Sequence, residues 1–260
     1  MGIMNITPDS FSDGGDLNHQ NKTHEYINDL INLNVNIIDI GAESTRPNSI
    51  KIDAETEIKR LSTLKLPLRH TQNTFFSIDT YKAKTAEFAL KNGFNVVNDV
   101  MGLQFDADMA KVIADHNASV IIMYNHSLTK NHSGNIITDA MTGLQKSLDI
   151  ALKHNIAPNK ICLDIGIGFG VKYEQNIALI NHIPHFKTLG FAIMVGASRK
   201  SFIGHYLNIA DPKQRLSGTL ATHYHAVKQG ADILRVHDVT AHQQFFKMLD
   251  ICQHTHHKEQ

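Results

Sequence analysis

The chain has few of the residues that stabilise small secreted proteins or build linkers. Its 260 residues include two cysteines, six prolines and no tryptophan. Two cysteines cannot form a disulfide framework, which excludes the disulfide-rich secreted class and suits a reducing cytoplasm. Cys162 and Cys252 each lie in an apolar pattern, so we expect both to be buried as small hydrophobic residues.

An excess of charge of one sign is also lacking, because 25 basic residues balance 25 acidic ones. A neutral chain has no overall field that would attract nucleic acid or anionic lipid, so we expect a small-molecule partner. No apolar run approaches the ~20 residues that span a bilayer, and the N-terminus lacks the layout of a signal peptide. These absences predict a cytoplasmic protein that binds neither nucleic acid nor membrane.

Histidine, in contrast, is abundant, with 17 residues that include a group from His254 to His257. A metal site is one interpretation of this group. A polar, solvated terminus beyond the last helix is the preferred interpretation.

Short apolar runs alternate with longer segments of helical period along the chain. This alternation is typical of βα units on a parallel sheet. It predicts an α/β fold, a (β/α)8 TIM barrel, with a doubly wound open sheet as the alternative. Because no stretch is rich in Pro, Gly or Ser, we expect residues 1–260 to form a single domain. The predicted strands are residues 2–5, 36–41, 75–79, 95–99, 119–124, 161–164, 191–196 and 233–237.

Several helices carry end signals and apolar faces. Thr80 stands where the N-cap of the helix after the third strand belongs. Gly93 and Gly230 are expected to end their helices in the left-handed conformation. One later helix is expected to bury an apolar face formed by Leu216, Leu220, Tyr224 and Val227.

Polar and charged residues end nearly every predicted strand. Parallel barrel strands are apolar, so a charge at a strand's carboxyl end is costly to bury and usually has a functional reason. Each residue alone could be a cap or part of a structural ion pair. Together they indicate one ligand site at the carboxyl ends of the strands. They are Asn5, Asp39, Glu43, Asp79, Asn98, Asp99, Asp164, Ser198 to Lys200, Arg235 and His237.

The signs of these charges are distributed unevenly. Acidic side chains follow the third, fourth and sixth strands and basic ones follow the seventh and eighth, as expected for a two-ended ligand. Arginine, lysine and histidine suit a phosphate, and a buried carboxylate can accept two N–H bonds from an amino-pyrimidine edge. Residues 7–15 and 43–48 are expected to cover the site as loops, with plain turns as the alternative.

The glycine run at residues 166–170 has the spacing G-x-G-x-G. It therefore lacks the G-x-G-x-x-G spacing of dinucleotide-binding sites. We expect these glycines to allow a close backbone approach to a ligand or a tight βα turn. Cys162, which shares the strand parity of Asp164, has no visible activating base, so we expect it to pack in the core.

Seven motifs, in this order, resemble those of the bacterial dihydropteroate synthases. They are MGIMNITPDSFSDGG, DIGAESTRPN, SIDT, VVND, LDIGIGFG, GASRKSFIG and RVHDV, spread from Met1 to Val239. The first motif alone is highly specific. The resemblance implies an enzyme of folate biosynthesis that condenses (6-hydroxymethyl-dihydropterin) diphosphate with 4-aminobenzoate. It also implies a (β/α)8 barrel, a homodimer and a target of sulfonamide drugs.

The resemblance further implies roles for matching residues. Asp79, Asn98, Asp164 and Lys200 would hold the pterin, and Thr45, Arg46, Arg235 and His237 would bind its diphosphate. Asn5 would help to hold Mg²⁺. Phe11, Pro47 and Ser201 would line the aminobenzoate pocket, and Asp13 would belong to a closing loop.

The implied mechanism resembles an SN1 reaction, in which diphosphate leaves before the weakly nucleophilic aniline nitrogen attacks. Asp79 and Asp164 would stabilise the cationic pterin methylene, with Lys200 beside them. Mg²⁺, Arg235 and His237 would stabilise the leaving group. Mg²⁺ suits this role because it takes few protein oxygens beside phosphate.

The chain departs from the family's pattern at three places. Ile165 stands within the usual Asp-Pro-Gly, Val171 replaces a frequent lysine, and the fifth strand ends Met-Tyr-Asn-His at residues 123–126. Two alternatives therefore accompany the synthase. One is a methyl-folate-dependent methyltransferase, against which the SRKS and RVHD motifs argue. The other is a non-catalytic paralogue that binds pterin diphosphate.

Overall fold

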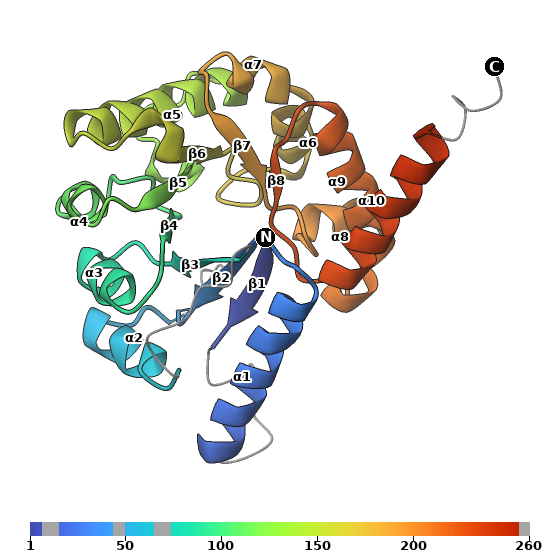
Figure 1. Cartoon of the computed structure of the whole chain (residues 1–260). Helices are drawn as coiled ribbons and strands as arrows, with labels where there is room; N and C mark the ends of the chain where they lie inside the picture. The colour runs from blue at the N-terminus through green and yellow to red at the C-terminus, as the bar shows by residue number, and fades with distance from the viewer. Residues whose placement is uncertain (7–15, 44–49, 65–73, 255–260) are drawn as a thin grey trace.

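The structure, a computed structural model, describes residues 1–6, 16–43, 50–64 and 74–254. Its strands form one parallel sheet that curls around the centre of the molecule (Figure 1). The strands are β1 (Gly2–Asn5), β2 (Ile37–Gly41), β3 (Phe75–Asp79), β4 (Val96–Asp99), β5 (Ser119–Met123), β6 (Ile161–Asp164), β7 (Ala192–Val195) and β8 (Ile233–Leu234).

The strands are neighbours in chain order from β1 to β8. A doubly wound sheet reverses its strand order at a switch point, so that alternative is wrong. Beyond β8, Val236 bridges to Gly2, and the Ile3 N–H donates to the Val236 carbonyl at 2.9 Å. The chain after the last strand therefore lies beside the first. The predicted α/β fold with eight parallel strands is confirmed.

Helices cover the outside of the curled sheet, and the chain runs around it in one direction (Figure 1). Among the described residues, no helix is long and apolar enough to cross a membrane. The helices are α1 (Asp16–Asn32), α2 (Ala54–Leu61), α3 (Ala83–Lys91), α4 (Met109–Asp115), α5 (Ile136–Lys153), α6 (Tyr173–Asn181), α7 (Ile183–Lys187), α8 (Ser201–Leu207), α9 (Leu216–Lys228) and α10 (Val239–His254). Short 3₁₀ turns are η2 (His126–Leu128), η3 (Pro158–Lys160) and η4 (Pro212–Gln214).

The two faces of the sheet contain different residues, because successive strand side chains point to opposite sides. One set, which includes Ile38, Ile78 and Val97, belongs to the main core with apolar residues of the helices. The alternate set forms a smaller cluster of Val96, Ile121, Cys162 and Met194. We call the side that carries the smaller cluster the concave side. The strand residues Asp39, Asp79 and Asp164 share it.

The two cysteines differ in environment. Cys162 is buried, and its burial, with Asp164 nearby, raises the pKa of the thiol to about 12. The neutral thiol packs as a hydrophobic group, as predicted. Cys252 is exposed, so the prediction that it is buried is wrong. It lies near the end of α10, where Met248 and Ile251 are exposed as well, and its apolar pattern does not face the core.

The prediction that Thr80 is the N-cap of α3 is wrong, whereas the predicted glycine helix ends are confirmed. The residue before α3 is Lys82, and the first N–H of the helix, on Ala83, donates to Asp106 Oδ2 at 2.8 Å. Thr80 instead donates its hydroxyl to Glu57 at 3.2 Å, because a buried carboxylate needs partners. The predicted glycine ends are confirmed, with φ of 95° at Gly93 and 103° at Gly230.

Helix α9 buries a face other than the predicted one. Its buried residues are Thr219, His223 and Ala226, whereas Val227 is 38% exposed. The reason is that Thr219 and His223 accept hydrogen bonds from the backbone that follows β7. The need of these backbone N–H groups for acceptors thus decides which face of the helix is buried, against the apolar pattern of its sequence.

The glycine run after β6 forms a turn, as predicted, and also lets other parts of the chain approach closely. Gly166 has φ of 76°, and a Cβ atom there would overlap the carbonyl oxygen of Tyr124. Gly168 has φ of 80°, and its Cβ would lie 3.0 Å from Cδ of Lys200. The absence of side chains therefore lets the loop after β6 pack against the end of β5 and against Lys200.

A matched pair of substitutions tests this packing. Gly190 also has positive φ, at 86°, but open space surrounds its missing Cβ. We expect Gly190→Ala to cost only backbone strain, about 1–2 kcal/mol. Gly166→Ala should cost about 1–3 kcal/mol more, because overlap with Tyr124 adds to the strain. Urea unfolding of both variants measures the difference, and equal losses would contradict the close approach.

Candidate active site

Four residues that are register partners form a row across the first four strands. Asn5 pairs with Gly41, Gly41 with Asp79, and Asp79 with Asn98. Register partners in a parallel sheet face the same side, so the three polar side chains are neighbours on the concave side. Gly41 leaves space between two of them, since a Cβ there would lie 3.5 Å from both Asn5 Oδ1 and Asp79 Cβ.

Arg235 joins this row to Asp39. Its Nε donates to Asp39 Oδ2 at 2.7 Å, and its Nη2 donates to Asp79 Oδ2 at 2.8 Å. Asn98 Nδ2 also donates to Asp39 Oδ2, at 3.1 Å. We call Asp39, Asp79, Asn98 and Arg235 the acid–arginine cluster. Buried carboxylates need such pairing, because an isolated buried charge is very costly.

The cluster leaves several acceptors without partners. In the described part of the chain, Asp39 Oδ1, Asp79 Oδ1 and Asn98 Oδ1 are buried and accept no hydrogen bond. A buried acceptor without a donor costs about 1–3 kcal/mol. The described residues therefore do not satisfy the cluster, and its chemistry favours a ligand that is rich in N–H donors.

Asp39 was given no role by the sequence analysis beyond its place among the polar strand residues. It is fully buried, and it accepts hydrogen bonds from both Arg235 and Asn98. Its signal in the sequence is a charge inside an apolar strand, two residues before Gly41 and hence on the same face. That signal indicates burial but does not reveal the partner, which lies 196 residues away.

Burial perturbs the two central carboxylates. It raises the pKa of Asp79 from 3.8 to about 7, against the opposing effect of the Arg235 guanidinium. It also raises the pKa of Asp164, where the Gly166 N–H and the charges of Lys200 and Arg235 oppose it. Because Lys200 and Arg235 act on both carboxyl groups, these four residues lie near one another at the strand ends. They do not lie at opposite poles of the molecule.

The loop after β6 positions Asp164 and Lys200. Asp164 Oδ1 accepts the Gly166 N–H at 2.8 Å, which fixes the carboxylate at the end of its strand. Nζ of Lys200 lies 4.3 Å from the centre of the Phe169 ring, within the range of a cation–π contact. A carboxylate at the end of β6 and an ammonium group after β7 thus both contact the same glycine-rich loop.

His237 is oriented by Ser198. The His237 N–H donates to Ser198 Oγ at 3.2 Å, and the ring atom Nδ1 lies 3.0 Å from the same oxygen. Because Oγ accepts the backbone N–H, its own hydroxyl can donate to Nδ1. In the tautomer in which this hydroxyl donates to Nδ1, the ring proton lies on Nε2, where it is a donor suited to an anion.

The turn that carries Ser198 and Lys200 is braced by α9. Arg199 has φ of 59°, and its N–H donates to Thr219 Oγ1 at 3.1 Å. Arg215 donates from Nη1 to the Arg199 carbonyl at 3.0 Å. The side chain of Arg199 forms a two-point ion pair with Asp238, next to His237. Side chains outside the site therefore fix the loops after β7 and β8.

A chain of two buried histidines links the same two loops. The Ala197 N–H donates to Nε2 of His223 at 3.1 Å, and Nδ1 of His223 lies 2.8 Å from Nε2 of His242. Nδ1 of His242 lies 2.7 Å from the Asp238 carbonyl. Burial and the neighbouring His242 lower the pKa of His223 to about 3, so it stays neutral. The sequence analysis missed this pair, because His223 lies on the face of α9 that is buried and not on the face that was predicted to be buried.

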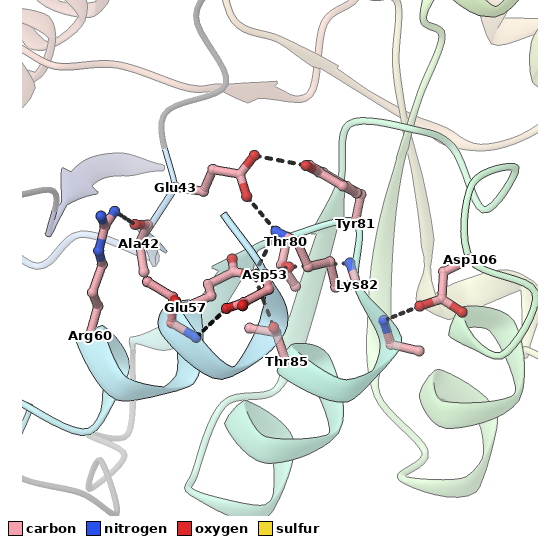
Figure 2. Close-up of polar contacts among 12 residues, drawn as sticks. Ala42, Glu43, Asp53, Glu57, Arg60, Thr80, Tyr81, Lys82, Thr85 and Asp106 are labelled. Atoms are coloured by element: carbon pink, nitrogen blue, oxygen red, sulfur yellow. Dashed lines mark hydrogen bonds and ion pairs between the residues drawn. The ribbon is translucent and has the colours of Figure 1, made fainter. Parts of the chain in front are cut away.

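Glu43 belongs to a separate buried ion network. This network joins the segments that follow β2 and β3 to helices α2 and α3 (Figure 2). It accepts a hydrogen bond from the Tyr81 hydroxyl at 2.7 Å and is paired with Lys82. Lys82 also lies 3.0 Å from Glu57, to which Thr85 donates at 2.9 Å. Glu43 and Glu57 are both buried. For Glu43, the structural ion pair is therefore the observed arrangement.

Asp99 likewise has a structural role. It accepts the N–H groups of Met101 and Leu103, both at 2.8 Å, and so closes the turn after β4. Its strand position alternates with that of Asn98, so it points away from the concave side.

Of the remaining predicted site residues, five lie outside the described residues, and Ser201 makes no hydrogen bond to the acid–arginine cluster within the described part of the chain. Phe11, Asp13, Thr45, Arg46 and Pro47 fall in the undescribed segments. Ser201 is exposed at the start of α8, beside a hollow of about 400 Å³ that Tyr173 and His205 also line. Of the departures from the family pattern, Ile165 is fully buried in the main core and Val171 packs against it.

Comparison with known proteins decides the family. The profile of the family described as "Pterin binding enzyme" matches residues 1–237. A dihydropteroate synthase of Clostridium beijerinckii is 40% identical over 252 residues, which cover 96% of this chain and 93% of the relative. The chain belongs to the dihydropteroate synthase family. The prediction made from the seven motifs is thereby confirmed.

Solved structures of dihydropteroate synthases resemble the chain throughout. One from Clostridium difficile, determined in the presence of pteroic acid, is 40% identical with a TM-score of 0.88, and covers 97% of this chain and 95% of its own. Another, from Xanthomonas albilineans with 4-aminobenzoic acid, is 30% identical with a TM-score of 0.90, and covers 98% and 92%. The curled parallel sheet is therefore the fold of this synthase family.

The pKa of Asp79 predicts a pH effect on stability. An acid with a higher pKa when folded binds its proton more tightly in that state, so its contribution is lost as the pH rises between the two pKa values. We expect the stability of the unsubstituted protein, relative to Asp79→Asn, to fall between about pH 4 and pH 7. Urea unfolding of both proteins across this range measures it. A relative stability that instead grows with pH would show that the Arg235 ion pair outweighs burial.

The network of Figure 2 predicts a large stability loss. Lys82→Met would leave Glu43 and Glu57 buried without their shared cation, so we expect the free energy of unfolding to fall by about 3–5 kcal/mol. Adding Glu57→Gln should restore part of it. The matched control Lys84→Met removes an exposed ion pair with Glu55 and should change little. Equal effects of Lys82→Met and Lys84→Met would contradict the network.

Proposed function

We propose that this chain joins (6-hydroxymethyl-7,8-dihydropterin) diphosphate to 4-aminobenzoate, with the acid–arginine cluster, Asp164, Lys200 and His237 as the site. The observation that carries the proposal is the grouping of unsatisfied buried acceptors with two cations at the strand ends. The ligands in the two solved structures, pteroic acid and 4-aminobenzoic acid, support it by analogy.

The acceptors suit the pterin ring. Its amino-pyrimidine edge carries N–H donors, and Asp164, Asp79 and Asn98 present carboxylate and amide oxygens to one space. Such donors would satisfy the oxygens of Asp79 and Asn98 that the described residues leave without partners. Lys200 would donate to ring acceptors, and its contact with Phe169 gives the ammonium a defined position. We assign the pterin to these four residues.

The cations and His237 suit the diphosphate. A guanidinium has five donors, of which Arg235 uses two on Asp39 and Asp79. The remaining donors, with Nε2 of His237, are suited to phosphate oxygens. We also assign Thr45 and Arg46 to the diphosphate. Phe11, Pro47 and Ser201 are assigned to the aminobenzoate, and Asp13 to loop closure.

Asn5 offers a fit for Mg²⁺. Its amide oxygen is a hard ligand, and it lies beside Asp79 at the strand ends, across the space left by Gly41. Mg²⁺ keeps several waters and takes few protein oxygens, so one amide beside a diphosphate is an adequate protein contribution. When bound, the ion would supply charge stabilisation to the leaving diphosphate.

The proposed reaction has two stages. The bond between the pterin methylene carbon and the diphosphate oxygen breaks first, and its electron pair leaves with the diphosphate. Asp79 and Asp164 stabilise the positive charge that develops on the methylene and ring, and Arg235 and His237 hold the leaving anion. The nitrogen of 4-aminobenzoate then forms the new bond to the methylene carbon and loses one proton.

Several further features belong to the proposal. Residues 1–260 form one domain in which the Val236–Gly2 bridge closes a (β/α)8 TIM barrel. The protein is a cytoplasmic homodimer, and sulfonamides compete with 4-aminobenzoate. Exposed apolar residues support a subunit interface on α9 and α10, where Val227, Met248 and Ile251 are 38%, 57% and 50% exposed.

One assay tests the function. Purified protein is incubated with pterin diphosphate, 4-aminobenzoate and Mg²⁺, and we expect dihydropteroate and diphosphate in equal amounts. Asp79→Asn should lower kcat by about 10²-fold or more, as for other preorganised electrostatic groups. The control Asp149→Asn changes an exposed carboxylate of α5 and should leave kcat unchanged.

The other outcomes separate the alternatives. Tight pterin binding without turnover would favour a non-catalytic paralogue. Methyl transfer from a methyl-folate, with no dihydropteroate, would favour a methyltransferase. Undiminished turnover of Asp79→Asn would remove Asp79 from the mechanism, and turnover that survives chelation of all divalent ions would remove Mg²⁺.

A further inference from the structure

The segment between β5 and α5 contains histidines that the proposed reaction does not use. The fifth strand is followed by Tyr124, and His126 begins the η2 turn. His132 lies in the loop that follows, and Asp139 lies in the first turn of α5. Two imidazoles and a carboxylate thus converge at a part of the chain where the sequence departs from the family pattern.

The donor atoms of these three residues lie close together. One ligand atom from each of His126, His132 and Asp139 lies within 4.8 Å of the other two. Nδ1 of His132 is 3.5 Å from Asp139 Oδ2. A tetrahedral ion with bonds of about 2.0–2.2 Å separates its ligands by roughly 3.3–3.6 Å. The histidine–aspartate pair already has that spacing, and only a small side-chain movement is needed for the third donor.

Neighbouring groups orient two of the three donors. The Tyr124 hydroxyl lies 2.6 Å from Nδ1 of His126, so we assign Nε2 of that ring as the metal donor. The Ser133 N–H donates to Asp139 Oδ1 at 2.8 Å, and the other oxygen, Oδ2, faces His132. Metal-binding histidines and carboxylates in proteins are commonly held by such outer hydrogen bonds.

We propose that His126, His132 and Asp139 bind a divalent transition-metal ion of the Zn²⁺ class. Two imidazoles with one carboxylate are a common donor set for Zn²⁺ and other first-row ions. Three protein ligands leave a fourth position for water. Asp139 is buried, whereas the His132 side chain is 49% exposed, so an ion reaches the site from the solvent side.

This site differs in chemistry from the one assigned to Asn5. Mg²⁺ demands octahedral geometry and prefers oxygen, so it is a poor occupant of two imidazoles and a single carboxylate. The site would also fix the segment after β5 to its surroundings. A Cβ on Gly170 would press into Ser127 Oγ and lie 3.5 Å from Cβ of His126, so this segment packs against the loop of Phe169. Bound metal would therefore stabilise the fold by linkage.

Zn²⁺ titration of the full chain tests the proposal. His254, His256 and His257 are first replaced by asparagine, so that the terminal histidines do not contribute. Calorimetry should then show one Zn²⁺ per chain, undiminished by millimolar Mg²⁺. We expect Asp139→Asn and His126→Ala to weaken binding by more than about tenfold, and Tyr124→Phe by about tenfold.

The control is His154→Asn, a half-buried histidine of the segment after α5 whose Nδ1 bonds the Ile150 carbonyl. It should leave Zn²⁺ affinity unchanged. His132→Ala is a second probe of the site, because the exposed side chain can be removed even if Asp139→Asn fails to fold. Loss of binding in His132→Ala but not in His154→Asn supports the site.

Co²⁺ provides an independent measurement. Four-coordinate Co²⁺ absorbs visible light much more strongly than the hexa-aquo ion, so the protein should acquire this absorption and His132→Ala should lack it. Three results would overturn the proposal: no Zn²⁺ uptake, equal uptake by the Asp139→Asn variant, or displacement of Zn²⁺ by Mg²⁺.

Discussion

The pairing of Arg235 with Asp39 and Asp79 is the interaction on which the site depends. Both carboxylates lie on the concave side of a parallel sheet, where an unpaired charge would be very costly. One guanidinium bridges β2 and β3 from the end of β8, so the chain after β8 must lie beside the first strands for the acids to be tolerated. The same pairing leaves other oxygens of the cluster without partners, and those oxygens are the feature that a pterin would complement.

The surrounding structure holds this cluster by polar contacts rather than by apolar packing alone. Arg215, Thr219 and His223 of the α9 region bond the turn after β7, and His242 extends that link to Asp238 after β8. Elsewhere, Lys82 joins Glu43 and Glu57 and so links the segments that follow β2 and β3 to helix α2 (Figure 2). Lys200 and His237 therefore stand on loops whose backbone is fixed from outside the site, as preorganised electrostatic groups require.

Much of the site was predictable because strand periodicity and strand-end polarity are local features of the sequence. The places of Asp79, Asn98 and Asp164 at strand ends follow from that pattern, and the glycine run was predicted to allow a tight turn. The buried face of α9 was not predictable, because its polar residues serve backbone groups of a distant loop. The prediction that Cys252 is buried failed for a related reason, since an apolar helix face need not point to the core of its own chain.

By itself the sequence determined the fold class, the eight strands, the family and the residues that end the strands, because these depend on periodicity and on contiguous motifs. Only the tertiary structure decided which charges meet. It joined Arg235 to acids more than 150 residues away, assigned Glu43 to a separate ion network, and gathered His126, His132 and Asp139 into one group. Such pairings depend on register and loop conformation, and these are set by packing between segments that are far apart in the chain.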